Sequence, residues 1–277
     1  MILQFIALTA LGLYVIASAL FLCAIILRSP DFHSVASKSL GIGFLAHTIV
    51  LVMLLFDLTS DVSEMTIERG DYFFWLAFVL VLVYYVLGRR TNYSLIAVFV
   101  AAGAALFLAG SNLTSYLNIG LRGEEASVVF FTVHVVPALI GQVCLAFALF
   151  VSIAFLIVEN RLRKKSFTAI APRVPNLELL DNLNLRFSVS GFLTISIAIL
   201  TGTIWKISHG LSLIPDDFAQ WSAILCWILL AFLLQSKVNF EWSGRKTATT
   251  TVIGAGFFFV TLFVFVLNDK SVLHVLQ

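Results

Sequence analysis

The sequence predicts an all-α, polytopic integral membrane protein with about eight transmembrane helices. Hydrophobic residues make up 60% of the 277 residues and charged residues only 12%, and the mean hydropathy is +1.03. A soluble domain has about half apolar and about a quarter charged residues. Polar residues fall in short groups between long apolar runs, so the composition indicates a chain whose main surroundings are a lipid bilayer.

Eight runs are apolar enough to cross a membrane. A helix needs roughly 20 such residues to span about 30 Å of hydrocarbon, because lipid cannot satisfy exposed backbone groups. In order, the runs cover residues 2–27, 40–56, 72–87, 93–109, 127–158, 185–206, 218–234 and 247–267. Arg89 and Arg90 separate the third run from the fourth, which favours a hairpin of two helices over one long helix.

The remaining stretches are short connections. The longest, residues 159–184, carries Pro172 and Pro175 and is typical of a cytoplasmic connector, with a short surface helix over 177–183. The first run lacks a basic start and a cleavage site, so we expect it to be retained. We expect residues 1–277 to form a single transmembrane domain, clearest over 127–268.

Charge in the loops predicts the orientation, because lysine and arginine favour the cytoplasmic side. Loops with basic residues alternate with acidic loops along the chain. The basic groups are Arg28 with Lys38, Arg89 with Arg90, residues 161–165 with Arg173, and Lys237 with Arg245 and Lys246. The acidic loops hold Asp57, Asp61, Glu64, Glu68 and Asp71, then Glu124 and Glu125, then Asp216 and Asp217. Both termini are therefore predicted to lie outside.

Charge and cysteine content exclude several function classes. A net charge of +2 is too small to favour a nucleic-acid partner. Cys23, Cys144 and Cys226 all lie within apolar runs without CxxC spacing, which argues against a disulfide frame or a zinc site.

The histidines are the most informative polar residues, because ionisable groups at membrane depth are costly. His47 lies in the middle of the second run, where it is either a hydrogen-bonded packing residue or a ligand or proton carrier. His134 lies near the outer end of the fifth run. His209 follows the sixth run and His274 follows the eighth. Each of these three, taken alone, also fits a solvated side chain.

The predicted topology brings polar and aromatic residues to one face. His134, His209 and His274 are all expected at the outer face, together with Trp205, Asp216, Asp217 and Trp221. Imidazoles and aromatic faces could hold a flat, iron-containing ring, with histidine as the axial ligand. The alternative is an ordinary interfacial belt of tryptophans with loop aspartates.

Several short motifs resemble one family. They are Leu180-Asp181-Asn182-Leu183, Gly191-Phe192-Leu193-Thr194, Thr201-Gly202-Thr203-Ile204-Trp205, Trp227, residues 242–248 (WSGRKTA) and Gly256-Phe257. In order and spacing they resemble the carboxyl-terminal core of the cytochrome c assembly family, the CcsA-like heme-handling membrane proteins. Upstream, Ala46-His47, Val133-His134, residues 159–165 and Pro175-Asn176-Leu177-Glu178 are similar to its eight-helix HemX/YpjD-type branch.

The resemblance implies site residues. Heme-handling members have an external heme platform, a tryptophan-rich loop ending in Trp-Asp, flanked by two histidines. By position these histidines fall on His134 and His274, the loop aspartate falls on Asp217, and His47 resembles the histidine of the second helix. Trp205 and Trp221 are expected to shield the ring.

The chain departs from the family pattern at two places. The platform tryptophans are absent from 207–216, and Gln235-Ser236 stands where a histidine often ends the seventh helix. The first departure weakens the stacking surface of an external heme site. The second removes a ligand from a bis-histidine site inside the membrane.

The resemblance implies that the chain is a multi-pass accessory protein of the bacterial inner (plasma) membrane. Its implied function is to hold b-type heme transiently during c-type cytochrome assembly. We expect that the protein is not itself an enzyme. The resemblance also implies a membrane partner in a cytochrome c assembly complex. Missing platform tryptophans favour an alternative, a regulator or partner protein in heme biosynthesis or magnesium homeostasis without stable heme. A transporter or enzyme that uses His47 is a third possibility, but the runs hold almost no acidic partner and no broken-helix pair.

Overall fold

The computed structural model describes residues 2–60, 69–88, 94–116, 128–164, 176–215, 218–239 and 244–267. These residues form eight helices and no strand, which confirms the all-α prediction. The helices are α1 (Ile2–Leu27), α2 (Pro30–Ser60), α3 (Arg69–Gly88), α4 (Ser94–Tyr116), α5 (Val128–Arg163), α6 (Leu177–Ser208), α7 (Phe218–Asn239) and α8 (Arg245–Leu267).

Seven of these helices are long and apolar enough to cross a membrane, and α3 contributes a shorter apolar stretch, Tyr72–Val86. Large apolar side chains such as Phe5, Ile26 and Leu200 are 62% to 73% exposed on the helices. Surface of this kind is expected to face lipid. The protein is therefore a polytopic membrane protein.

The connector before α6 differs from the prediction. Residues 177–183 are not a separate surface helix but the first two turns of α6. Asn176 caps this end, because its side chain accepts a hydrogen bond of 2.7 Å from the Leu179 backbone N–H. Hydropathy alone stopped the run at the polar residues Asp181 and Asn184, yet both are partnered inside the fold, so the helix continues through them.

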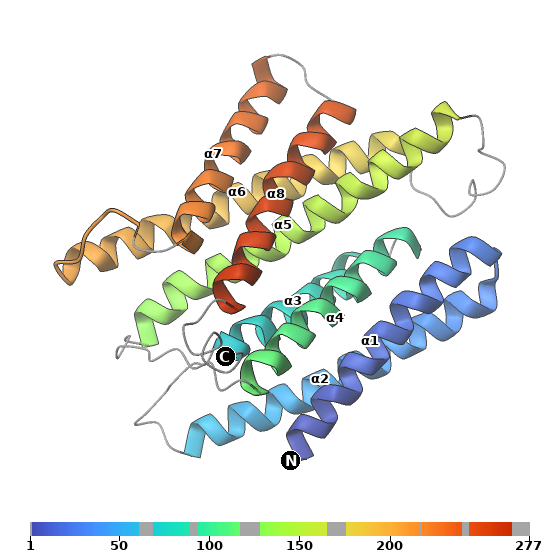
Figure 1. Cartoon of the computed structure of the whole chain (residues 1–277), viewed down its shortest axis with the longest axis horizontal. Helices are drawn as coiled ribbons and strands as arrows, with labels where there is room; N and C mark the ends of the chain where they lie inside the picture. Colours follow the sequence, from blue (N-terminus) through green and yellow to red (C-terminus); the bar gives the residue numbers. More distant parts are fainter. Residues whose placement is uncertain are drawn as a thin grey trace, which may run out of the picture. The chain divides into compact units, whose positions relative to one another are not determined.

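Contacts divide the chain into two compact units. The first holds α1 to α4, in which α1 packs against α2 and α4, and α3 packs against α4 (Figure 1). Alanines spaced along one side of α1, Ala10, Ala17 and Ala24, are completely buried, and small residues of this kind let membrane helices approach closely.

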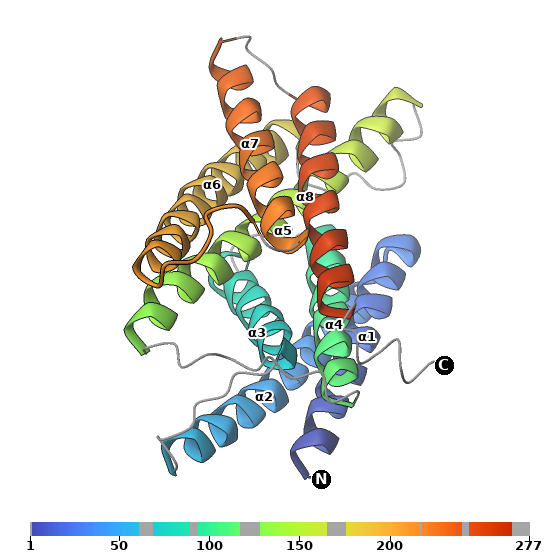
Figure 2. The same cartoon turned by 60° about the vertical axis from the view of Figure 1, so that its left-hand side comes forward.

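The second unit holds α5 to α8. Here α5 lies beside α6 and also contacts α8, while α7 packs against α8, as Figures 1 and 2 both show. The contacts divide the chain into two units. The single transmembrane domain expected over 1–277 remains a prediction. Every described candidate residue except His47 belongs to the second unit.

Candidate functional site

His134 lies on α5, two turns after the helix begins, and contacts α6. Its Nδ1 lies 2.9 Å from the carbonyl oxygen of Ala198 and 3.4 Å from the hydroxyl oxygen of Thr201. A carbonyl oxygen can only accept, so Nδ1 carries the proton of this hydrogen bond. In the neutral ring, Nε2 then bears the lone pair. This is how metal-binding histidines are commonly oriented, with one ring N–H donated to a backbone carbonyl.

Glycines set the distance between α5 and α6 around His134. A Cβ atom on Gly202 would lie 3.0 Å from Cε1 of His134, so the imidazole rests directly on the backbone of α6. Farther along the same crossing, a Cβ on Gly141 would lie 2.6 Å from Cγ1 of Ile195 and 3.2 Å from its backbone nitrogen. The sequence motif containing Gly202 thus has a packing role: it lets His134 reach the Ala198 carbonyl.

Pro137 lies inside α5, one turn after Val133 and His134. Proline has no N–H and its ring crowds the carbonyl four residues earlier, so the turn that carries His134 lacks one helical hydrogen bond. Neighbouring helices make such a proline tolerable in a membrane.

Trp205 and His209 form the end of α6. The two rings are tilted by 35° with centroids 4.5 Å apart, and Nδ1 of His209 donates to the Trp205 carbonyl over 2.9 Å. His209 is exposed. Its ring is held by its own helix rather than by a neighbouring one, so this arrangement alone also fits a helix-capping histidine.

The segment after His209 folds back along the helix end. Nζ of Lys206 lies 2.9 Å from Oε1 of Gln220 on α7 and 3.5 Å from the Ile214 carbonyl oxygen. Leu213 and Ile214 are 60% and 69% exposed, so this segment presents apolar side chains where the family platform has tryptophans. Trp221, at the start of α7, is 54% exposed. Two predicted site residues, Asp217 and His274, lie outside the described residues.

His47 lies on α2 in the first unit and is completely buried. Nδ1 lies 3.1 Å from the hydroxyl oxygen of Tyr14 on α1, and the ring meets Phe74 and Phe78 of α3 edge to face at centroid distances of 4.2 and 5.5 Å. Nε2 is buried without a hydrogen-bond partner among the described residues. The surroundings are those of a packed residue with one unused nitrogen.

At the end of the second unit away from His209, polar residues connect α6 with α7 and α8. The sequence did not predict these residues as a group. Asp181 accepts from Nζ of Lys237 at 3.0 Å and from the Gly244 N–H at 3.1 Å. Gly244 has a φ of 63°, a left-handed conformation that favours glycine. One turn deeper, Asn184 shares hydrogen bonds of 3.3 Å with Thr251 on α8. The quoted motifs around Asp181 and Gly244 therefore contact each other, a pairing that spacing alone could not reveal.

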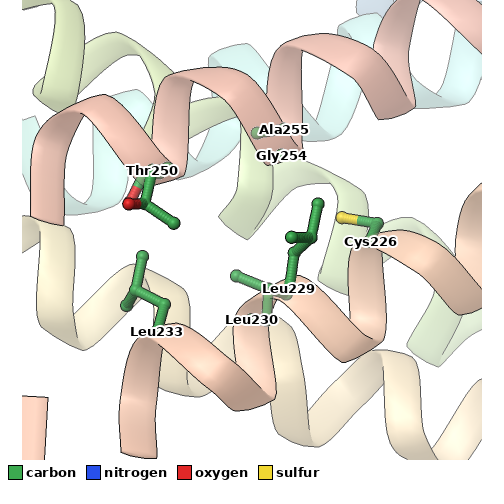
Figure 3. A pocket seen from close by; sticks show the side chains of 8 residues that line it. Cys226, Leu229, Leu230, Leu233, Thr250, Gly254 and Ala255 are labelled. Atoms are coloured by element: carbon green, nitrogen blue, oxygen red, sulfur yellow. The ribbon is translucent and has the colours of Figure 1, made fainter. Parts of the chain in front are cut away.

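The pocket between α7 and α8 is too small to hold a heme. Figure 3 shows its lining, with Cys226, Leu229, Leu230 and Leu233 from α7 facing Thr250, Gly254 and Ala255 from α8. Its volume is about 10 Å³, close to that of one water molecule. Nor do the described residues contain a group of three or more histidine, cysteine or carboxylate side chains that could hold a metal ion.

Together, these features define a multi-span membrane protein with an imidazole fixed at one end of a four-helix unit. The chain belongs to the cytochrome c assembly protein family, whose sequence model matches residues 6–274. This confirms the predicted family; the HemX/YpjD-type branch stays a prediction.

Among curated proteins, the chain is similar to cytochrome c biogenesis proteins CcsA of cyanobacteria. It is 29% identical over 99 residues to that of Prochlorococcus marinus strain NATL2A, covering 35% of this chain and 31% of the relative. It is 31% identical over 77 residues to that of Synechococcus sp. strain CC9902 and 32% identical over 77 residues to that of strain RCC307. Each of these two matches covers 28% of this chain and 25% of the relative. The matches thus span less than a third of the relatives' length. No solved structure matches the chain.

Proposed function

We propose that this protein handles heme in the assembly of c-type cytochromes, in the inner membrane of a bacterium. The observation that carries the proposal is the orientation of His134 in a chain of the cytochrome c assembly family. The Ala198 carbonyl accepts a hydrogen bond from Nδ1–H of His134, so the lone pair of the neutral ring is on Nε2, the atom that would coordinate iron. The family match over residues 6–274 and the similarity to cytochrome c biogenesis proteins CcsA support this assignment.

The described residues include one histidine that is suited to be an axial ligand of a heme. His134 is half-buried and neutral imidazole is a usual ligand of heme iron. A second imidazole would come from His209 or from His274. Bound heme would supply the iron that is delivered to an apocytochrome, and it would be b-type and held only in transit. Trp205 and Trp221 would shield the ring, with Asp217 at the same loop.

The protein is proposed to hold and present rather than to catalyse. His134 binds and orients, and the apolar residues of the helix end exclude water. Attachment of heme to a protein requires a thioether-forming site, for which a membrane partner in a cytochrome c assembly complex is proposed. His47 has a different place in this proposal: its enclosure by Tyr14, Phe74 and Phe78 favours packing over coordination.

A second function is supported by a specific observation. Where platform tryptophans stack in the family, this chain has the exposed aliphatic residues Leu211, Leu213 and Ile214. Aliphatic side chains offer no aromatic face to a porphyrin. The second candidate is therefore a regulator or partner protein in heme biosynthesis or magnesium homeostasis, without stable heme.

An absorbance spectrum decides between the two. We expect the full-length protein, purified in detergent, to carry heme or to bind added hemin with a Soret band of ligated iron. His134→Ala should shift and broaden that band, whereas His33→Ala should leave it unchanged. A wild-type protein that carries no heme and binds no hemin would overturn the heme-handling function and leave the regulatory one.

A further inference from the structure

Two arginines from different helices share one carboxylate at the end of the second unit away from His209. Oε1 of Glu159 accepts hydrogen bonds from Nε and Nη2 of Arg163, one turn farther along α5, over 3.0 and 2.8 Å. Oε2 of the same carboxylate accepts a hydrogen bond from Nη1 of Arg245, the first residue of α8, over 3.1 Å. Glu159 therefore holds two guanidinium groups side by side.

The shared carboxylate leaves this pair of arginines with an excess of positive charge. The Glu159 side chain is only 12% exposed, whereas the side chains of Arg163 and Arg245 are 66% and 51% exposed. Arg161 on α5 and Lys246 on α8 add two more exposed basic side chains. An anion that approaches from outside the protein therefore meets guanidinium groups, while the carboxylate between them is largely covered.

The arginine pair lies at the depth of the lipid headgroups. Arg163 is the last residue of one membrane-spanning segment, Val133–Arg163, and Arg245 is the first residue of another, Arg245–Phe263. Basic sites between the ends of spanning helices are suited to anionic headgroups. A guanidinium group presents paired N–H donors that match the oxygens of a phosphate. The position and the chemistry of the pair both point to a phospholipid phosphate.

A row of exposed residues on α8 continues from Arg245 into the membrane. The row has four-residue spacing and consists of Arg245, Thr249, Ile253 and Phe257. Ile253 is 62% exposed, Phe257 is 40% exposed, and Val260 after them is 62% exposed. An acyl chain can pack on this apolar row directly below the arginines. Inorganic phosphate would use the arginines alone, so the combination favours a lipid.

We propose that Arg163 and Arg245 bind the phosphate of an anionic phospholipid whose acyl chain lies along Ile253 and Phe257. The bound lipid joins the end of α5 to the start of α8 from the membrane side, in addition to the ion pairs with Glu159. The site is at the opposite end of α5 from the heme-handling histidine, and its occupation does not depend on heme.

Thermal melting of the full-length protein in detergent tests the site. The added probes are dioleoyl phosphatidylglycerol, dioleoyl phosphatidylcholine and inorganic phosphate. Wild type should gain melting temperature only with phosphatidylglycerol. Arg163→Gln and Arg245→Gln should each weaken the apparent affinity for phosphatidylglycerol about fivefold. The control Arg28→Gln, which removes an exposed arginine from the first unit, should leave that affinity unchanged.

Glu159→Gln separates lipid binding from a purely structural role of the ion pairs. The variant loses both ion pairs, so the lipid-free protein should melt at a lower temperature than wild type. Both arginines remain, so phosphatidylglycerol should still stabilise it. If Arg163→Gln and Arg245→Gln also melt lower but keep the wild-type affinity for phosphatidylglycerol, the arginines serve only the ion pairs and the proposal is overturned.

The three probes decide what the site recognises. Equal stabilisation by phosphatidylcholine would show that contact with acyl chains suffices, and equal stabilisation by inorganic phosphate would show a site for a free anion. Either result would overturn the assignment to an anionic lipid, as would a wild type that none of the probes stabilises. Hemin binding is measured separately, so failure of the lipid site leaves the heme-handling function in place.

Discussion

His47 in the first unit and His134 in the second are both histidines within membrane-spanning helices, but their surroundings differ. His47 is enclosed by side chains, with Tyr14 on one nitrogen and two phenylalanine rings against its edges. His134 is half-buried, rests on a glycine and bonds to a backbone carbonyl. A histidine surrounded by aromatic side chains stabilises helix packing. A histidine on bare backbone, with one nitrogen fixed, is arranged to offer the other.

The outer site proposed for His134 requires that both termini lie outside the cytoplasm. A reporter fusion tests this orientation with an active or inactive result. Because four basic loops alternate with acidic ones, a reporter fused after Gln277 should be active only outside the cytoplasm, and one inserted within 161–171 only inside. The opposite pattern would place His134 at the cytoplasmic face and undo its assignment to an outer site.

The largest change in stability is expected for His47→Ala. The substitution removes a completely buried ring from contact with Phe74 and Phe78 and leaves a cavity, which should lower the free energy of unfolding by about 3 kcal/mol. Folded yield by size-exclusion chromatography should fall, while hemin bound per folded protein stays constant. If His47→Ala instead keeps full yield and loses hemin, His47 is a ligand and the contrast between the two histidines is wrong.

A smaller loss is expected for Gly141→Ala. Its Cβ would lie 2.6 Å from Ile195 Cγ1, and overpacking of this kind costs about 1–3 kcal/mol. Thermal melting in detergent measures it. The matched control is Gly256→Ala on α8, where a Cβ meets nothing within 4 Å; alanine should be neutral or stabilising there. Equal melting of both variants would show that the α5–α6 crossing is not limited by Gly141.

The smallest expected effects come from two substitutions that each remove one side-chain hydroxyl beside a histidine. They distinguish the contribution of side-chain hydrogen bonds from that of the backbone carbonyl. Tyr14→Phe keeps the ring but removes the hydroxyl partner of His47, and should cost about 0.6 kcal/mol, the average for interhelical hydrogen bonds in membranes. Thr201→Val should cost less and leave the hemin spectrum unchanged, because the Ala198 carbonyl still orients His134. A spectral change in Thr201→Val would mean that the threonine hydroxyl, not the carbonyl, fixes the tautomer.

Sequence alone determined the membrane class, the family and the eight helices that the described residues form. Long apolar runs force helices, because backbone groups cannot remain unpaired in lipid, and eight such runs are readable by composition. The start of α6 was misplaced because hydropathy treats Asp181 and Asn184 as breaks. Their partners, Lys237 and Thr251, lie on other helices and are invisible to any local pattern.

Only the tertiary structure decided what each histidine can do. His47 and His134 look alike in the sequence, a single histidine in an apolar run. Their difference comes from neighbours distant in the chain: Tyr14 and Phe74 around the first, Ala198 and Gly202 around the second. Which nitrogen carries the proton is set by the atom across the helix interface, and an amino-acid sequence does not specify that atom until the helices have packed.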